Sequence, residues 1–254
     1  MFEALGQRLR AYAEKDGRGY PDWATRYVPV VKRLRRRALH TSTILEIGAN
    51  ANGFARFAKE RVVVVDIDKA HLQEARAVQD VLPVVADAGR LPFGPQSVDV
   101  CVCVDTFEHL SADARDQAVA EIVRALRSTG TAVLAFPDGA RAARAEERIN
   151  AEYRQMTGRA IAWLEQHAAG HLPDADAVVR RLTDLARATH RVSRVKNASL
   201  WVWVWMWRVL MCGWPGRGNA LFQALLRLGT PVLCRMHFGT CYRTMIWLEP
   251  TEGP

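Results

Sequence analysis

The chain has 254 residues, of which 49% are hydrophobic, and a formal net charge of +8. A chain of this length can bury a full core, and its simplest organisation is one domain, 1–254, with insertions. The charge is spread along the chain, and its densest run, KRLRRR at 32–37, lacks the interleaved aromatic residues of a nucleic-acid site. We therefore predict a solvated helix face there and no nucleic-acid partner.

The cysteines and the N-terminal segment bear on the cellular compartment. Five cysteines with no paired spacing argue against a disulfide framework. Cys101 and Cys103 alternate on one face of a predicted strand, which indicates small core residues rather than metal ligands. The N-terminal segment has no apolar run of signal-peptide length. These observations predict a cytoplasmic protein.

Residues 1–40 are predicted to form a helical cap, because Phe2, Leu5 and Leu9 recur at helical spacing. From 41 to 137 the chain alternates Val/Ile-rich segments with amphipathic ones. We expect strands and helices over these segments, in order: Thr43–Ile47, Gly53–Glu60, Val62–Asp66, Lys69–Val81, Val84–Ala86, Val98–Val104, Ala112–Arg127 and Thr131–Phe136. Strands with so little alternation suit a parallel sheet covered by helices on both faces.

The ends of these strands carry residues that suit a nucleoside. The first strand runs into a turn of Gly and Asn residues after Glu46, and the second ends at Asp66. Gly and Asn accept a positive φ, and an acid at the tip of the second strand is placed to bind a ribose diol. The third strand ends at Asp87 and the fourth at Asp105.

Four motifs in this order resemble those of class I S-adenosylmethionine-dependent methyltransferases. They are the E-I-G turn, the Asp66 strand end, the D-A-x-x-L-P-F run from Asp87, and the V-D-V-x-V-x-x-x-x-x-E-H-L run that ends at Leu110. The resemblance covers about Ile44 to Pro137 and is closest to small-molecule methyltransferases. It implies S-adenosyl-L-methionine as the cofactor and 41–137 as the cofactor-binding core.

The resemblance also implies the fold. We expect an α/β, Rossmann-like, seven-stranded methyltransferase sheet, parallel with an antiparallel last strand, with helices on both faces. Arg191–Asn197 and Tyr242–Leu248 would be strands six and seven, with helical insertions before each.

The turn after the first strand would lie under the methionine part of the cofactor. By resemblance its residues are Glu46, Gly48, Asn50 and Gly53. The family usually has glycine where this chain has Asn50 and Asn52, and Asn tolerates the left-handed region better than other non-glycine residues. For Glu46, a structural acid that braces the turn is an equal alternative to direct cofactor contact.

The nucleoside part of the cofactor would contact the ends of the second and third strands. The resemblance implies that Asp66 binds the ribose hydroxyls and that Ile67 lies against the adenine. Asp87 would accept a hydrogen bond from the adenine amino group, and Ala88 would contribute its backbone. We interpret Asp68 as the N-cap of the following helix.

Two residues near the fourth strand are candidates for catalysis. Asp105 would lie at the mouth of the site near the reacting methyl group, where it would also contact the cofactor. His109 is the natural candidate for a general base, although the E-H pair is often structural in this family. His167 and His171 have the i, i+4 spacing of metal ligands, but Gly170 suggests that the helix ends between them, and no third ligand is fixed by the spacing. We therefore predict no metal site.

Two insertions interrupt the expected fold, a helical one at 138–172 and a Trp-rich one at 198–238. The Trp-rich segment could form a strand, or a helix in which Trp201/Trp205 and Trp203/Trp207 are i, i+4 pairs. Its apolar run is shorter than the roughly 20 residues that a bilayer span requires. It is therefore either a lid packed on the sheet edge or an interfacial hairpin that contacts a membrane surface.

Three functional hypotheses follow. The first is an enzyme that moves a methyl group to an oxygen or nitrogen of a small molecule, of the glycan or lipid-linked kind. The second is a non-catalytic module that binds the cofactor, and the third is a peripheral membrane protein that acts through the Trp-rich insertion. A Rossmann dehydrogenase requires a G-x-G-x-x-G turn, which this chain lacks.

Overall fold

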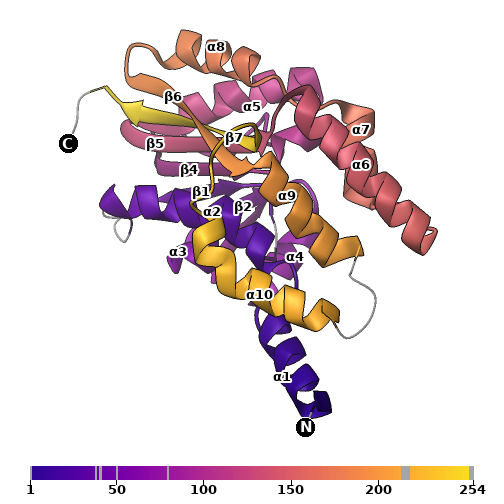
Figure 1. Cartoon of the computed structure of the whole chain (residues 1–254). Helices are drawn as coiled ribbons and strands as arrows, with labels where there is room; N and C mark the ends of the chain where they lie inside the picture. Colours follow the sequence, from indigo (N-terminus) through magenta and orange to yellow (C-terminus); the bar gives the residue numbers. More distant parts are fainter. Residues whose placement is uncertain are drawn as a thin grey trace.

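The computed structural model describes residues 2–37, 39, 42–49, 51–78, 80–212 and 218–251. Its centre is one seven-stranded sheet in the order β3-β2-β1-β4-β5-β7-β6, in which β7 runs antiparallel to both of its neighbours (Figure 1). The strands are β1 (Ile44–Ile47), β2 (Val62–Asp66), β3 (Val81–Val85), β4 (Val98–Val104), β5 (Leu126–Pro137), β6 (His190–Ser199) and β7 (Cys241–Pro250). The predicted fold class is confirmed.

The central strands bury both faces because their side chains are apolar on both sides. Along β4, Cys101 and Cys103 point into one hydrophobic cluster, whereas Val100, Val102 and Val104 point into another. This alternation follows from the period of two in a strand. The prediction that the two cysteines are core residues is confirmed.

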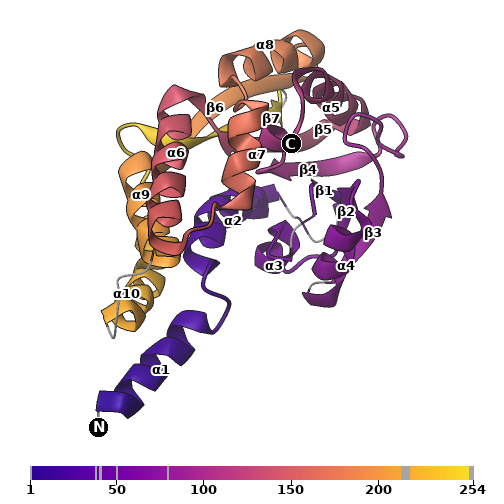
Figure 2. The same ribbon diagram turned by 90° about the vertical axis from the view of Figure 1, so that its right-hand side faces the viewer.

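Helices cover both faces of the sheet (Figures 1 and 2). One cluster is completed by α5 (Ala112–Ala125) and α8 (Ala175–Ala186). The other is completed by α2 (Tyr20–Leu34), α3 (Phe54–Ala58) and α4 (Lys69–Val78). The sheet is therefore the middle of three layers.

The insertions form a third, smaller core beside the sheet. The first consists of α6 (Gly139–Thr157) and α7 (Ala162–Gly170), and the second begins with α9 (Leu200–Trp207). Side chains from these helices pack together with Tyr242 at the start of β7. Figure 2 shows α6, α7 and α9 gathered at one side of the sheet. The two insertions thus support each other.

The Trp-rich segment is helical, so the strand alternative is wrong. The helix α9 continues as a π-helical turn, η4 (Arg208–Cys212), and is followed by α10 (Gly218–Leu233), which lies against α1 (Phe2–Glu14). Tryptophan rings pair at i, i+4, with 6.3 Å between the centroids of Trp201 and Trp205. The second pair, Trp203 and Trp207, is buried in the third core, whereas the first pair is exposed.

Several element boundaries differ from the predicted ones. The helix α4 ends at Val78 rather than Val81, because Val81 already begins a strand that pairs with Val62 of β2. The helix α5 likewise ends at Ala125, and β5 begins at Leu126 rather than Thr131. Helix termini are the parts of an element that local sequence patterns define least.

Candidate active site

Glu46 braces the turn that follows β1. Its carboxylate is buried and accepts a hydrogen bond from the backbone N–H of Phe54, at 2.7 Å. Phe54 opens α3, whose N-cap residue Gly53 has no side chain to cap it. Glu46 thus supplies the acceptor that the free N–H groups of a helix N-terminus require.

We expect the Glu46→Gln substitution to change how stability depends on pH. Burial raises the pKa of Glu46 from 4.5 to about 7, although hydrogen bonds from Phe54 and Ala55 oppose this. The folded state therefore holds the proton more tightly than the unfolded state. The stabilisation is complete below pH 4.5 and is lost as pH rises through about 7. Urea titrations should show that this pH-dependent loss, up to about 3 kcal/mol in the wild type, is smaller in the variant; equal pH profiles would contradict it.

Gly48 lies where the ends of β1 and β4 come together. Its φ is +91°, and an added Cβ would collide with the side chain of Thr106. The Thr106 hydroxyl donates to the carbonyl of Ile47, at 3.0 Å, and so connects the two strand ends. Glycine is required here for both its backbone conformation and the close approach.

Replacing Gly48 with alanine should therefore destabilise the fold more than placing an alanine at a positive φ does where there is no steric clash. Gly158→Ala is the matched control, because Gly158 has a φ of +71° but open space around its Cβ position among the described residues. We expect Gly48→Ala to lose about 1–3 kcal/mol more than this control in urea unfolding, the usual cost of overpacking. Equal losses of unfolding free energy in the two variants would show that the Thr106 side chain moves aside without cost.

The tips of β2 and β3 present the side chains predicted to hold a nucleoside. Asp66 accepts hydrogen bonds from the N–H groups of Ala49 and Asp68, each at 2.7 Å. Each carboxylate oxygen has a second lone pair, so Asp66 can still accept from a diol. The side chain of Ile67 is 72% exposed beside it.

The remaining residues predicted for the cofactor lie along the same edge. Asp87 is exposed, and its carboxylate accepts from the N–H of Gly89 at 2.8 Å. Ala88 is half-buried next to it. Asn50 lies outside the described residues. Asp68 caps α4 by accepting from the N–H of Ala70 at 2.7 Å, so its predicted role as N-cap is confirmed.

Asp105, which follows β4, is held in a buried ion cluster. Arg243 donates to both of its oxygens, at 2.6 and 2.7 Å, and Arg26 lies 2.8 Å from one of them. Arg26 also pairs with the buried Asp22. Burial alone would raise the pKa of Asp105, but the charges of Arg243 and Arg26 outweigh it and lower the pKa. Both oxygens are engaged, so the side chain is a fixed anion that positions the end of β4.

His109 lies in the 3₁₀ turn η3 (Phe107–His109), directly after this strand end, and its side chain is exposed. Partial desolvation of its ring by the surrounding protein, together with the neighbouring His167, nevertheless lowers its pKa to about 4. The imidazole is therefore neutral at neutral pH. The rings of His109 and His167 lie 4.8 Å apart, centroid to centroid.

Several residues near the site carried no sequence motif. Arg243 lies within a strand predicted from its apolar neighbours. A single charged residue in such an apolar run was the sequence feature that could have indicated a buried ion pair. Glu146 lies on α6, where it looks like one acid among many. The helix α7 ends at Gly170, as predicted, and His171 lies beyond it with a φ of 57°. His167 therefore points toward η3 without His171 beside it on a helix face.

Residues 45–134 match the family model described as "Methyltransferase domain". That segment runs from β1 into β5 and includes the residues predicted to bind the cofactor at the ends of β1, β2 and β3. The chain therefore contains a methyltransferase domain. The protein is a methyltransferase, and S-adenosyl-L-methionine is its cofactor. The chain matches none of the curated proteins.

Solved structures share the fold of this methyltransferase. A putative methyltransferase from an antibiotic biosynthesis pathway of Anabaena variabilis has a TM-score of 0.56 and 16% identity, over 88% of this chain and 98% of that one. A possible histamine N-methyltransferase from Thermotoga maritima has a TM-score of 0.53 and 15% identity, over 99% and 100%. The complex of Haloferax volcanii Trm112 methyltransferase activator with a putative methyltransferase contains a chain with a TM-score of 0.52 and 16% identity, over 92% and 96%.

The described residues of the methyltransferase fit the nucleoside half of its cofactor. A partly exposed acid with free acceptor capacity, Asp66, lies at the tip of β2, an exposed apolar side chain lies beside it, and an exposed acid, Asp87, follows β3. A ribose diol and an adenine amino group donate hydrogen bonds and require such acceptors, and an adenine face requires such an apolar surface. When bound, the sulfonium of the cofactor supplies an activated methyl group.

Proposed function

We propose that the methyltransferase acts on an oxygen or nitrogen of a small molecule, with Asp66, Ile67, Asp87 and Ala88 holding the nucleoside. Glu46, Gly48, Asn50 and Gly53 would form the turn under the methionine part. The observation that carries the proposal is the position and protonation state of His109. It is an exposed, neutral imidazole next to the end of β4, at the edge of the sheet that carries the predicted cofactor residues. An acceptor that loses a proton during transfer needs such a group nearby.

A basic cavity beside this edge favours an acceptor that carries an anionic group. The cavity has a volume of about 690 Å³, and its lining includes Arg141, Arg144, Arg194, Lys196 and Arg243. Because Arg243 also holds Asp105 at the end of β4, the cavity adjoins the site. Phosphorylated or carboxylated glycans and lipid-linked metabolites have the required charge.

The protein's contribution to methyl transfer would be mainly positional. Holding the acceptor in line with the methyl group and sulfur lowers the barrier by as much as about 7–11 kcal/mol. The packed helices α6, α7 and α9 would exclude water from one side of the acceptor. The His109 imidazole would take part in activating the acceptor atom.

A turnover assay tests this proposal. We expect formation of the demethylated cofactor with phosphorylated acceptors and less with their neutral counterparts. His109→Ala should lower kcat by about 100-fold or more, while calorimetry shows unchanged cofactor binding. Arg144→Ala, on the cavity wall, should raise KM with little change in kcat. Equal turnover of charged and neutral acceptors would contradict the acceptor class.

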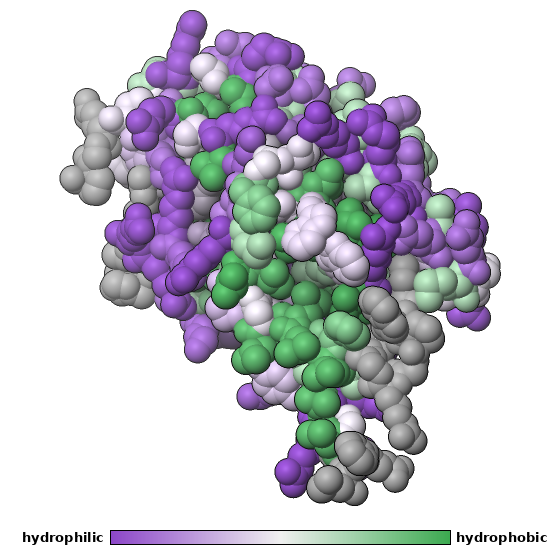
Figure 3. Space-filling view, viewed as in Figure 1, coloured by the Kyte–Doolittle hydropathy of each residue, from purple (hydrophilic) through white to green (hydrophobic). Residues whose placement is uncertain are grey.

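One observation also favours contact with a membrane surface. Trp201 is 63% exposed and Trp205 is 42% exposed, and Figure 3 shows apolar residues gathered over the region of α9 and α10. The exposed apolar residues of α10 form one helical stripe: Leu221, Leu225, Leu228 and Val232. An apolar face of this kind in a basic protein suits the interface of an anionic membrane. Among the described residues, no helix has the length and apolar character needed to cross a bilayer.

Vesicle co-sedimentation tests this second proposal. We expect binding to vesicles that contain anionic lipid, and its loss in a Trp201→Ser/Trp205→Ser variant. The buried Trp203 and Trp207 are unsuitable for this test, because they hold the third core together. Leu185→Ser, at a half-exposed position on α8, is the control. Unchanged vesicle binding by the Trp201→Ser/Trp205→Ser variant would show that this face does not contact the membrane.

A further inference from the structure

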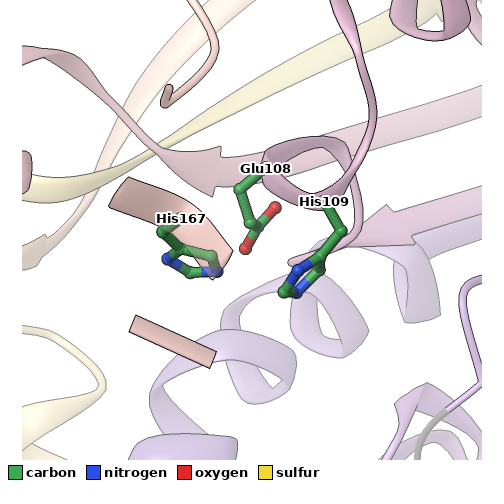
Figure 4. Close-up of side chains that lie close together, drawn as sticks. All are labelled: Glu108, His109 and His167. Carbon is green, nitrogen blue, oxygen red and sulfur yellow. The ribbon is translucent and has the colours of Figure 1, made fainter. Parts of the chain in front are cut away.

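Three side chains of metal-ligating type converge beside the end of β4. Glu108 and His109 come from η3, and His167 comes from α7 in the first insertion. One potential ligand atom from each lies within 4.8 Å of the others. Figure 4 shows the Glu108 carboxylate between the two imidazole rings. We call these residues the Glu–His cluster.

Two members of the Glu–His cluster are buried, and each has one polar atom without a hydrogen-bond partner among the described residues. The side chains of Glu108 and His167 are only 1% and 4% exposed. Glu108 Oε2 and His167 Nε2 have no hydrogen-bond partner among the described residues. Leaving such atoms buried and unpaired costs about 1–3 kcal/mol each. Two unpaired acceptors in one cluster indicate that a cation belongs between them.

A second layer of residues orients His167 for binding. Its Nδ1 lies 3.0 Å from Glu146 Oε1, and the hydroxyl of Tyr242 donates to the same carboxylate oxygen. Glu146 is itself buried. A carboxylate at Nδ1 places the proton there and leaves the lone pair on Nε2. This is the usual support of a histidine that binds a metal ion.

We propose that Glu108, His109 and His167 bind a divalent transition-metal ion. Two imidazoles and one carboxylate are the donor set of catalytic zinc and iron sites, and they leave at least one position open. Bonds of about 2.0–2.2 Å require the ligand atoms to lie closer together than they do here. The exposed side chain of His109 can rotate inward to close the cluster.

The role of the ion rests on the function proposed above. An acceptor hydroxyl bound at the open position would have a lowered pKa and lose its proton to water. The resulting oxygen anion would form a bond to the methyl carbon as the carbon–sulfur bond breaks. The electron pair of the broken bond would go to the sulfur, which changes from a sulfonium to a neutral thioether. His109 would then activate the acceptor as a metal ligand rather than as a base. This favours a hydroxyl over an amine.

Metal titration of the chelator-treated, tag-free chain tests the site. We expect one equivalent of Co²⁺ to bind with visible ligand-field bands, and Zn²⁺ to displace it. Glu108→Gln and His109→Ala should each weaken binding at least tenfold, and Glu146→Gln should weaken it by about 10–100-fold. His171→Ala is the control. Because His171 lies outside the cluster, this variant should bind the metal ion as tightly as the wild type does. His109→Ala changes an exposed residue, so it keeps the test valid if the Glu108 variant misfolds.

Absence of metal binding by the wild type, or wild-type affinity in both the His109→Ala and the Glu108→Gln variants, would overturn the site. In that case a proton shared between Glu108 and His167 accounts for the buried pair. Cofactor binding measured on the same samples separates this failure from failure of the proposed function. Cofactor binding without metal binding overturns the metal site alone. Methyl transfer that proceeds fully after chelation overturns the catalytic role of the ion.

Discussion

Replacing Arg243 with methionine is expected to reduce the free energy of unfolding by about 3–5 kcal/mol. Arg243 is only 1% exposed, and its guanidinium binds both oxygens of Asp105. The substitution leaves the buried carboxylate with only Arg26 as a charged partner, and removing one partner of a buried ion pair has this cost. Urea unfolding of the two proteins measures the difference.

Arg194→Met is the matched control for this substitution. Arg194, on the neighbouring strand β6, pairs with Asp138 and Asp176 but is 40% exposed. Exposed ion pairs contribute about 0–1 kcal/mol, so the control should be nearly as stable as the wild type. An Asp105→Asn/Arg243→Met double variant should lose less than the two single variants together. Equal losses in Arg243→Met and Arg194→Met would show that the buried cluster is not a stabilising unit.

Replacing Asp66 with alanine is expected to weaken S-adenosylmethionine binding by about 10–100-fold. Hydrogen bonds from a ribose diol to a charged acceptor contribute about 1.5–3 kcal/mol, and each 1.4 kcal/mol changes affinity tenfold. The alanine variant also loses the acceptor for the N–H of Ala49. Asp66→Asn keeps one acceptor oxygen, so it separates support of the turn from binding of the diol.

Asp68→Ala is the control for the Asp66 variants. Asp68 lies two residues further on and caps α4. Its loss should cost about 1 kcal/mol of stability without changing the affinity for the cofactor. Equal weakening by the two alanine variants would mean that the ends of β2 and α4 act only as scaffold.

The sheet was predictable because local signals and tertiary packing agree there. Val-rich segments such as 62–66 bury both faces, and the acids and glycine that follow them lie at one edge by the geometry of parallel strands. Asp68 shows the same agreement, since a helix N-cap is decided within a few residues. The helical form of the Trp-rich segment was not decided locally, because Trp and Val alternate in a pattern that suits both strand and helix.

The side chains around the end of β4 were less predictable because they come from distant segments. His167 lies 58 positions beyond His109, and only the packing of α7 against η3 brings them together. Asp105 was predicted near the reacting methyl, yet its carboxylate is bound by Arg243, 138 residues away. Burial of charge depends on partners that sequence spacing does not reveal.

Calorimetric titration of the intact chain with S-adenosylmethionine, and with its demethylated product, tests the central claim most directly. We expect one molecule of either ligand to bind per chain with micromolar affinity, and the two to compete. If the Asp66 variants also lose affinity for both ligands, the shared site lies at the edge formed by the ends of β1 and β2. Absence of binding heat for both ligands, from a chain that is folded by circular dichroism, would contradict the assignment of the cofactor.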